Sequence, residues 1–184
     1  MPRPPRDFVP GSTYHVFARG SNRQPIFVFD SDRIDFLACL ARVVNHGALR
    51  CLSYCLMSNH YHLVVKTHDG ELSRAMKALN GRYSLRFNRR YDRDAHLFKN
   101  RFQAVRQASE GQLLWTLRYT VMNPVEKGLC GRPEEWPWSS YRASIGLERP
   151  PPFLDVQGLM TYFGGMPEQA RSAYRAFVDG FVGV

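Results

Sequence analysis

The chain has 184 residues, 44% of them hydrophobic and 22% charged, which is the composition of an ordinary globular domain. Its formal net charge of +9 favours a polyanionic partner, of which nucleic acid is the commonest. No apolar run approaches the roughly 20 residues of a membrane span, and residues 1–7 lack a signal-like apolar segment, so we expect a cytoplasmic protein without a membrane partner.

The first half of the chain predicts a strand, a helix and a hairpin. Asp30 and Ser31 are both plausible N-caps for the helix, and Gly47 follows its end. Ser58-Asn59 has turn chemistry and joins the two strands of the hairpin. The expected elements are a strand at 12–19, a helix at 30–45 and strands at 49–57 and 60–66.

The second half predicts two further helices around a fourth strand region, and then a helical tail. Ser109 and Gln112 form a capping-box pattern that opens the second of these helices. That helix is expected to end at Asn123, because a residue before proline disfavours helical geometry. The other expected elements are a helix at 71–90, a strand region at 97–106 and closing helices at 155–163 and 167–181.

This order of elements, β-α-β-β-α-β, predicts an α+β fold of the ferredoxin-like split β-α-β type. We expect an antiparallel sheet with helices on one face, an added helix after the fourth strand, and C-terminal helices. Residues 1–148 would form the main domain and residues 149–184 a helical appendage. The four cysteines form no Cys-x-x-Cys motif and are expected to be small buried hydrophobes; they are Cys39, Cys51, Cys55 and Cys130.

Two histidines stand at the start of the second hairpin strand. Side chains on a strand alternate between faces, so His60 and His62 point the same way and Tyr61 points to the other face. Two neutral imidazoles one strand-step apart can share a cation. An isolated His-x-His pair makes only ordinary hydrogen bonds at least as often as it binds a metal ion. The remaining histidines have no partner at ligand spacing and are interpreted as structural.

The helix after Ser109 carries a second polar pair. Leu113, Leu117 and Val121 are spaced by four and would face the core. Tyr119 lies nearly opposite that stripe, and Asn123 follows it by one turn on the same face. The pair is either an exposed tyrosine beside a C-capping asparagine, or a phenolic nucleophile beside an amide ligand for a cation.

Basic side chains accompany these elements. Arg19 and Arg23 flank a loop after the first strand. The helix at 71–90 carries many arginines and no acid after Glu71, which favours phosphate contact by Arg82 and Arg86. In the fourth strand region, Lys99 and Arg101 are two residues apart and would share one face.

Four segments together resemble the REP-associated tyrosine transposases, relatives of the single-tyrosine HUH transposases. The resemblance extends over about residues 8–145, and the motifs stand in the family's order. The segments are Tyr14-His15-Val16 with Arg19-Gly20, Leu56-Met57-Ser58-Asn59-His60-Tyr61-His62-Leu63, Leu97-Phe98-Lys99-Asn100-Arg101-Phe102, and Tyr119-Thr120-Val121-Met122-Asn123-Pro124-Val125.

The resemblance implies a mechanism and a substrate. His60, His62 and Asn123 would hold a divalent metal ion, Mg²⁺ or Mn²⁺, and Tyr119 would attack a phosphate of single-stranded DNA. The products would be a 5′-phosphotyrosine link and a free 3′-hydroxyl. A phenolate is a better leaving group than an alkoxide, which keeps the step reversible. Two histidines and an amide would by themselves suggest a softer metal than Mg²⁺.

The expected substrate is single-stranded or hairpin-forming palindromic DNA, and the protein would be nucleoid-associated and act as a monomer or homodimer. Two alternatives stay open: a DNA-binding regulator of the same fold, with catalysis lost or secondary, and a metal hydrolase of another class. The first is disfavoured by the intact set of His60, His62, Tyr119 and Asn123. The second would need further histidine or carboxylate ligands. Tyr61 is interpreted as a packing residue.

Overall fold

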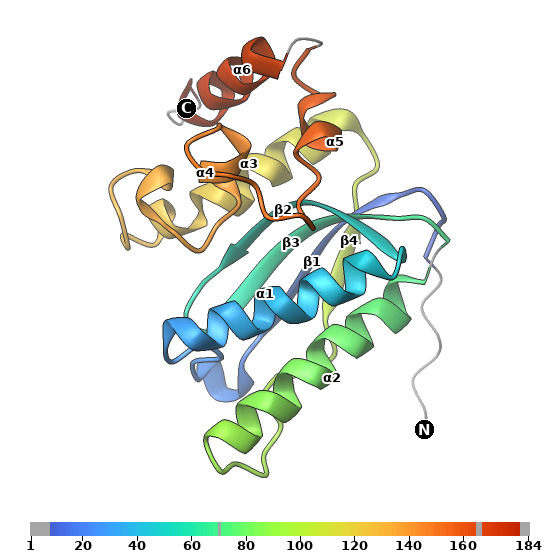
Figure 1. Ribbon diagram of the computed structural model, residues 1–184, viewed down its shortest axis with the longest axis vertical. Coiled ribbons are helices and arrows are strands. Elements are labelled where there is room, and N and C mark those ends of the chain that lie inside the picture. Colours follow the sequence, from blue (N-terminus) through green and yellow to red (C-terminus); the bar gives the residue numbers. More distant parts are fainter. Residues whose placement is uncertain (1–7, 70, 165–166, 181–184) are drawn as a thin grey trace.

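The computed structural model describes residues 8–69, 71–164 and 167–180. Four strands form one antiparallel sheet in the order β2-β3-β1-β4 (Figure 1). Their bounds are Thr13–Arg19 for β1, Leu49–Leu56 for β2, His60–Thr67 for β3 and Gln103–Arg106 for β4. With one helix after β1 and one after β3, this is the split β-α-β arrangement, and the α+β fold class expected from the sequence is confirmed.

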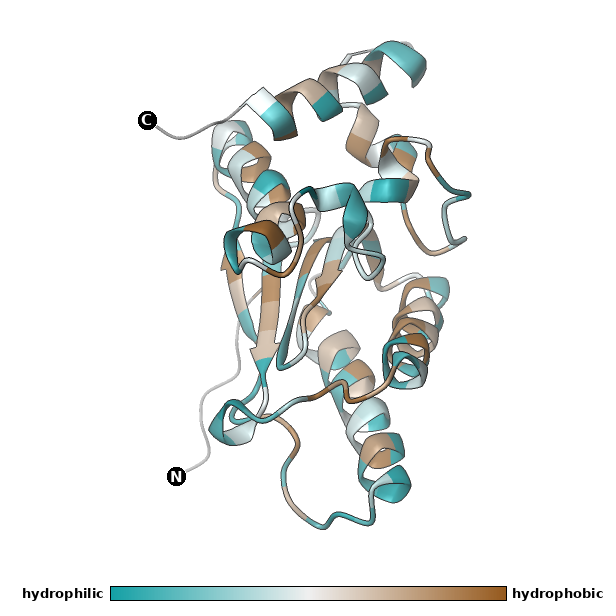
Figure 2. Cartoon of the chain, turned by 90° about the vertical axis from the view of Figure 1, so that its left-hand side faces the viewer, coloured by the Kyte–Doolittle hydropathy of each residue, from teal (hydrophilic) through white to brown (hydrophobic). Residues whose placement is uncertain are grey.

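Helices cover both faces of the sheet. Helices α1 (Asp30–Asn45) and α2 (Leu72–Arg90) lie side by side on one face, as expected. Helix α3 (Glu110–Glu126) lies on the other face with the shorter C-terminal helices (Figure 1). Figure 2 shows the apolar strands enclosed between these two layers. The remaining elements are η1 (Ser21–Arg23), η2 (Pro133–Glu135), α4 (Tyr141–Ser144), α5 (Val156–Met160) and α6 (Pro167–Gly180).

Strand alternation separates a packed face from a face that carries polar groups. Tyr61 is fully buried on the side of α1, where its ring packs 4.7 Å from that of Phe36 and its hydroxyl donates to Asn80 Oδ1. His62, one residue on, faces α3 and contacts the ring of Tyr119. The sequence-based interpretation of Tyr61 as a packing residue is therefore confirmed.

Three expected boundaries are wrong, and one of them is the end of the helix expected at 155–163, which spans only Val156–Met160. The fourth strand begins at Gln103, where regular pairing with β1 starts opposite Phe17. The residues before it meet the end of β1 through an isolated bridge between Phe98 and Gly20 and a bond from the Lys99 N–H to the Arg19 carbonyl, which do not form a continuous ladder.

Helix α3 continues past Pro124 to Glu126. The missing proline N–H removes one bond near the helix end, but the carbonyls of Asn123 and Pro124 still accept from Lys127 and Leu129. The last expected position of the C-terminal helix, residue 181, lies outside the described residues, as do residues 1–7.

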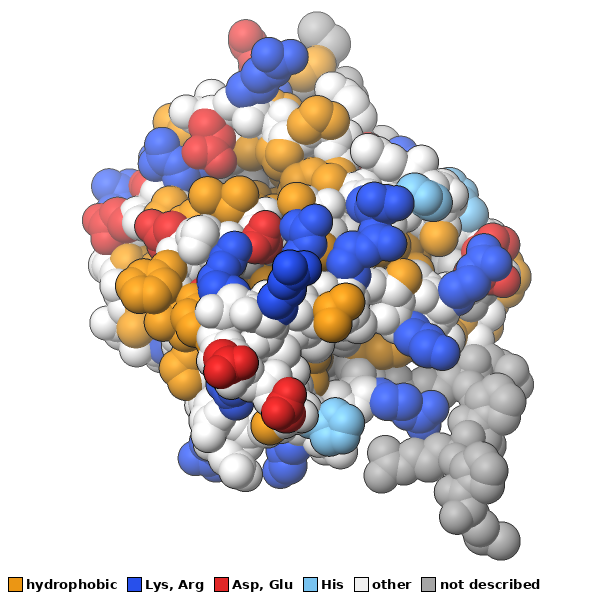
Figure 3. Space-filling view, turned by 60° about the horizontal axis from the view of Figure 1, so that its bottom comes forward, with side chains coloured by type: hydrophobic (Ala, Val, Ile, Leu, Met, Phe, Trp, Pro, Cys, Tyr) orange, Lys and Arg blue, Asp and Glu red, His pale blue; other side chains and the backbone are white. Residues whose placement is uncertain are grey.

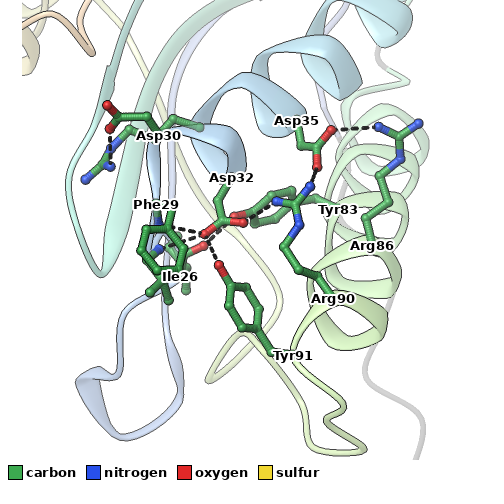
Figure 4. Close-up of polar contacts among 11 residues, drawn as sticks. Ile26, Phe29, Asp30, Asp32, Asp35, Tyr83, Arg86, Arg90 and Tyr91 are labelled. Carbon is green, nitrogen blue, oxygen red and sulfur yellow. Dashed lines mark hydrogen bonds and ion pairs between the residues drawn. The ribbon is translucent and has the colours of Figure 1, made fainter.

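The start of α1 is fixed by a buried carboxylate rather than by the expected caps. The N-cap is Phe29, and Asp32 accepts hydrogen bonds from the N–H groups of Val28 (2.8 Å) and Phe29 (3.0 Å). The same carboxylate accepts from the Tyr91 hydroxyl (2.7 Å) and pairs with Arg90 at the end of α2 (Figure 4). Asp30 and Ser31 are thus inside the helix, and Asp32 joins its first turn to the end of α2.

This network keeps Asp32 ionised although it is fully buried. Burial alone would raise the pKa of the Asp32 carboxyl, but its hydrogen bonds, led by those from Phe29 and Tyr91, lower it below its ordinary value. Arg90 also pairs with Asp35, one turn along α1 (Figure 4). The two helices are therefore joined at this end by charge as well as by apolar packing.

The C-terminal segment packs against the edge strand β2. Leu154 forms a backbone bridge with Cys51, and Asp155 pairs with Arg50. Residues of α5 and α6 belong to the same apolar cluster as the sheet. The division at residue 149 stays a prediction. The cysteines are free thiols, and Cys39, Cys51 and Cys55 are buried as expected. Among the described helices, none has the length and apolar character to cross a bilayer.

Candidate active site

A cavity of about 370 Å³ lies where the sheet meets α3. It brings together seven of the residues that the sequence singled out: His60, His62, Tyr119, Asn123, Arg19, Lys99 and Arg101. It also contains six that the sequence did not: His15, Phe17, Ala18, Asn100, Gln103 and Lys127. Residues distant in the chain meet here because β1 and β3 are paired, with Arg19 opposite His60 and Phe17 opposite His62.

His60 and His62 are each oriented by a hydrogen bond at their own Nδ1 atom. His60 Nδ1 lies 2.7 Å from Asn59 Oδ1, and the amide nitrogen of Asn59 in turn donates to the Arg23 carbonyl. An amide oxygen only accepts, so we assign the proton of His60 to Nδ1. His60 Nε2 is then a lone-pair atom. Asn59, a turn residue by sequence, therefore fixes the tautomer of its neighbour.

His62 has a matching partner in His15. The two rings are stacked, and His15 Nε2 lies 2.9 Å from His62 Nδ1. If His62 Nδ1 donates, as His60 Nδ1 does, its Nε2 is also a lone-pair atom. His15 is therefore not a lone histidine, as its spacing in the sequence suggested, because β1 lies next to β3 and projects this ring toward His62. Its interpretation as a structural histidine stays a prediction.

All three imidazoles are neutral near pH 7. Burial lowers the pKa of His15 to about 4. Burial lowers the pKa of His60 to about 4 as well, with a further contribution from the nearby Arg19 and an opposing one from Asn123. Burial, followed by the proximity of His15 and His60, lowers the pKa of His62 well below its ordinary range. Neutral imidazole is the form that binds a cation.

The donor set fits a divalent cation. His62 Nε2 and Asn123 Oδ1 are both buried and have no hydrogen-bond partner among the described residues, and both line the cavity. Buried polar atoms are seldom left unpaired unless something else satisfies them. The described residues contain no group of three or more His, Cys, Asp or Glu side chains that could hold a metal ion, so a third ligand beside the two histidines would have to be of another kind, such as Asn123 Oδ1.

Tyr119 lies beside this donor set. Its ring meets the His62 ring edge-on, with centroids 5.4 Å apart, and the His15 ring at 5.9 Å. On its other side the ring is stacked on Trp115, with centroids 5.2 Å apart and planes within 6°. Trp115 is one turn earlier on α3 and is 56% exposed. The tyrosine ring is therefore held between the two histidines and an exposed tryptophan.

The charge around the cavity is positive. Arg19, Lys99, Arg101 and Lys127 line it, and none of the described lining residues is acidic. Such a cavity favours a phosphate group. Lys99 and Arg101 reach it although their segment is not a strand; the N–H of Lys99 bonds to the carbonyl of Arg19 and holds the segment against the end of β1.

The other predicted DNA contacts, Arg23, Arg82 and Arg86, lie outside this cavity. The sequence suggested that the arginines of α2 have no acidic side chain nearby to pair with. This is wrong for Arg86, which forms an ion pair with Asp35 of α1 at 3.1 Å. Arg82 makes no ion pair among the described residues. Lys and Arg side chains nevertheless form a band across the face seen in Figure 3, with apolar groups between them.

The role of Asn59 can be tested through metal affinity. In Asn59→Ala, His60 loses the acceptor that fixes its tautomer, and we expect Mn²⁺ to bind about 10 to 100 times more weakly. Isothermal titration calorimetry of the DNA-free protein measures this directly. Asn45→Ala, at the exposed end of α1, is the control and should bind as the wild type does. Equal affinity in both variants would show that Asn59 is only a turn residue.

Comparison with known proteins agrees with this architecture. A solved REP-associated tyrosine transposase bound to a REP hairpin shares the fold, with a TM-score of 0.67 and 15% identity over 79% of this chain and 86% of that one. A candidate transposase from Deinococcus radiodurans R1 is 16% identical over 68% of this chain and 96% of that one, with a TM-score of 0.46.

A tRNA(His) guanylyltransferase from Saccharomyces cerevisiae is 10% identical over 94% of this chain and 80% of that one, with a TM-score of 0.48. At such scores the last two similarities carry no functional argument. No curated protein matches the chain in sequence. Residues 8–127, however, match the family described as "Transposase IS200 like". The chain therefore belongs to the IS200-like transposases, as the resemblance of its motifs implied.

Proposed function

We propose that the protein is a single-stranded DNA endonuclease and strand transferase that acts on hairpin-forming palindromic DNA. The observation that supports this most directly is the position of Tyr119, whose ring contacts His62 in the cavity that also contains His60 and Asn123. A tyrosine hydroxyl beside uncharged ligand atoms for a metal ion, in a cavity lined by Lys and Arg side chains, is suited to attack on a phosphodiester.

The proposed step is a transesterification. The Tyr119 hydroxyl loses its proton and its oxygen forms a bond to the scissile phosphorus, while the bond from phosphorus to the 3′ oxygen breaks. The departing 3′ oxygen takes up a proton, which leaves a 5′-phosphotyrosine link and a free 3′-hydroxyl. Arg19, Lys99 and Arg101 neutralise the charge on the phosphate oxygens. The 3′-hydroxyl of the same or another strand can reverse the step.

The atoms that would hold a divalent cation, Mg²⁺ or Mn²⁺, are His60 Nε2, His62 Nε2 and Asn123 Oδ1. When bound, such an ion supplies Lewis-acid polarisation of a phosphate oxygen. Because two imidazoles and an amide carry no formal charge, they leave the positive charge of the ion undiminished. The preference of this donor set for a softer metal than Mg²⁺ makes Mn²⁺ the better first choice in an assay.

The proposed partner is DNA with a hairpin. The structurally similar REP-associated transposase is bound to a REP hairpin, and the band of Lys and Arg in Figure 3 offers a surface for a folded polyanion. Tyr119 contacts the ring of His62 within the same chain. This supports action as a monomer, with nucleoid association as the corresponding prediction for the cell.

The test uses labelled hairpin-bearing single-stranded DNA, incubated with the protein and Mn²⁺ or Mg²⁺ and separated on a denaturing gel. A covalent protein–DNA band that disappears with a chelator is the expected result. Binding without such a band under any divalent metal would favour a regulator of the same fold. Strand cleavage without a covalent band would instead indicate a metal hydrolase.

The salt dependence of binding tests the cationic residues. Lys99→Gln and Arg101→Gln should each flatten the plot of log affinity against log salt by about 0.7 to 0.9, because each would remove one phosphate contact. Arg82→Gln, predicted from the sequence, should do the same. Arg86 is paired with Asp35, so Arg86→Gln should change the slope by less than half as much. An equal change in all four variants would contradict this distinction.

A further inference from the structure

No hydrogen bond from a described residue holds the side chain of Tyr119 in place, and its ring is only partly buried. Three other rings contact it instead. His15 and His62 meet it edge-on from the sheet, and Trp115 is stacked on it from the same helix. Among the described residues, only Trp115 lies parallel to the phenol. The direction in which the Tyr119 hydroxyl points therefore depends on ring contacts.

Trp115 stands at the position toward which the helix directs the Tyr119 ring. Side chains of an α-helix lean toward its N-terminus, so each covers the turn before it. Trp115 is one turn before Tyr119 on α3, with ring centroids 5.2 Å apart and planes within 6° of parallel. The stack restricts rotation about the two side-chain torsions of the tyrosine. With a short side chain at position 115, the phenol would be free to rotate away from the cavity.

Packing in the core does not account for this tryptophan. Its side chain is 56% exposed, whereas Leu113, Leu117 and Val121 of the same helix are buried in the apolar cluster. Trp115 is also not one of the described residues that line the cavity of the candidate active site, so it is not placed to contact the reacting phosphate. The contact that its position provides is the one with the Tyr119 ring.

We propose that Trp115 is a positioning residue, which keeps the Tyr119 phenol beside His62 and directed at the scissile phosphate. The inference rests on the function proposed above and extends it from the nucleophile to the residue that orients it. The rate of attack depends on how often the phenolic oxygen is in the attacking geometry. Stacking of two aromatic rings favours one arrangement over others by about two- to tenfold. Trp115 itself takes part in no bond formation or proton transfer.

The kinetic test measures formation of the covalent product from labelled hairpin-bearing single-stranded DNA with Mn²⁺, at increasing protein concentration. Trp115→Leu should lower the rate at saturation by about two- to tenfold, while the protein concentration that gives half of this rate changes by less than about twofold. Leucine is a good helix former, so α3 should stay intact. Trp115→Phe keeps an aromatic ring and should recover most of the rate. The control is Leu129→Ala, which shortens a 50% exposed side chain beyond the end of α3 and should react as the wild type does.

Fluorine NMR tests the orientation of Tyr119 without DNA. The protein is labelled with 3-fluorotyrosine, and Tyr119→Phe identifies which of the nine tyrosine signals belongs to Tyr119. An indole stacked on the phenol displaces this signal from the position of an exposed tyrosine. Trp115→Leu should remove most of the displacement, and Trp115→Phe should keep part of it.

An unchanged rate at saturation in Trp115→Leu would overturn the proposal, and weaker DNA binding at that unchanged rate would mean that the indole contacts DNA instead. An equal loss of rate in Trp115→Leu and Trp115→Phe would also overturn it, because the stack would then not be the cause. Failure of the proposed function has a different signature. If the wild type forms no covalent band but the fluorine signal moves in Trp115→Leu, the chemistry is refuted and the orientation of Tyr119 by Trp115 is not.

Discussion

Tyr119→Phe is expected to abolish the covalent protein–DNA product, with a loss of at least about a thousandfold in the rate of its formation. The substitution removes only the hydroxyl oxygen that would bond to phosphorus. The ring keeps its stacking on Trp115 and its edge contacts with His62 and His15, so the cavity should keep its shape. DNA affinity should therefore stay within about twofold of the wild type, since one hydroxyl contributes little to binding.

The matched control is Tyr61→Phe, which removes the hydroxyl of the tyrosine that stands between the two histidines. Its ring is on the opposite side of the sheet, buried against Phe36, and its hydroxyl donates to Asn80. This variant should still form the covalent product. A product that survives Tyr119→Phe but not Tyr61→Phe would reverse the assignment, and a product that survives both would show that neither phenol is the nucleophile.

The order of the elements and the central constellation follow from local patterns. Alternation along a strand predicts that His60 and His62 share a face, and helical spacing predicts the same of Tyr119 and Asn123. The structure places all four at one cavity. Their roles in metal binding and catalysis stay predictions, which calorimetry and the covalent gel assay address.

The contacts that the sequence did not predict are made between elements that are distant in the chain. His15 has no partner at ligand spacing in the sequence, and only the antiparallel register of β1 against β3 brings it to His62. Arg86 has no acid nearby on its own helix, and only the packing of α1 on α2 supplies Asp35. Both errors have one cause: a sequence shows neighbours along one element, while these partners lie across two.

Asp32→Ala should destabilise the fold strongly, by roughly 2 to 4 kcal/mol in the free energy of unfolding. The carboxylate is fully buried and accepts from Val28, Phe29 and Tyr91, so its removal leaves several donors unpaired at once. Arg90 is 37% exposed and keeps its ion pair with Asp35 in this variant. The loss of stability should therefore be smaller than that caused by breaking a fully buried ion pair. Thermal unfolding should shift down by roughly 5 to 15 °C.

The control is Asp30→Ala, two residues earlier in the same helix. That carboxylate is 73% exposed and pairs only with Arg33 among the described residues, so its loss should cost less than about 1 kcal/mol. Equal destabilisation in the two variants would show that the effect comes from charge at the helix start rather than from the buried network.

The pH dependence of Asp32→Asn separates the charge of the carboxylate from its shape. Because the folded protein lowers the pKa of Asp32, the stability that its charge contributes is fully present above the ordinary aspartate range and is lost as pH falls through the lowered value. The difference in unfolding free energy between wild type and Asp32→Asn should therefore be constant near pH 7 and shrink in acid. A difference that persists unchanged below the lowered pKa would mean that the ionised form of Asp32 does not stabilise the junction of α1 and α2.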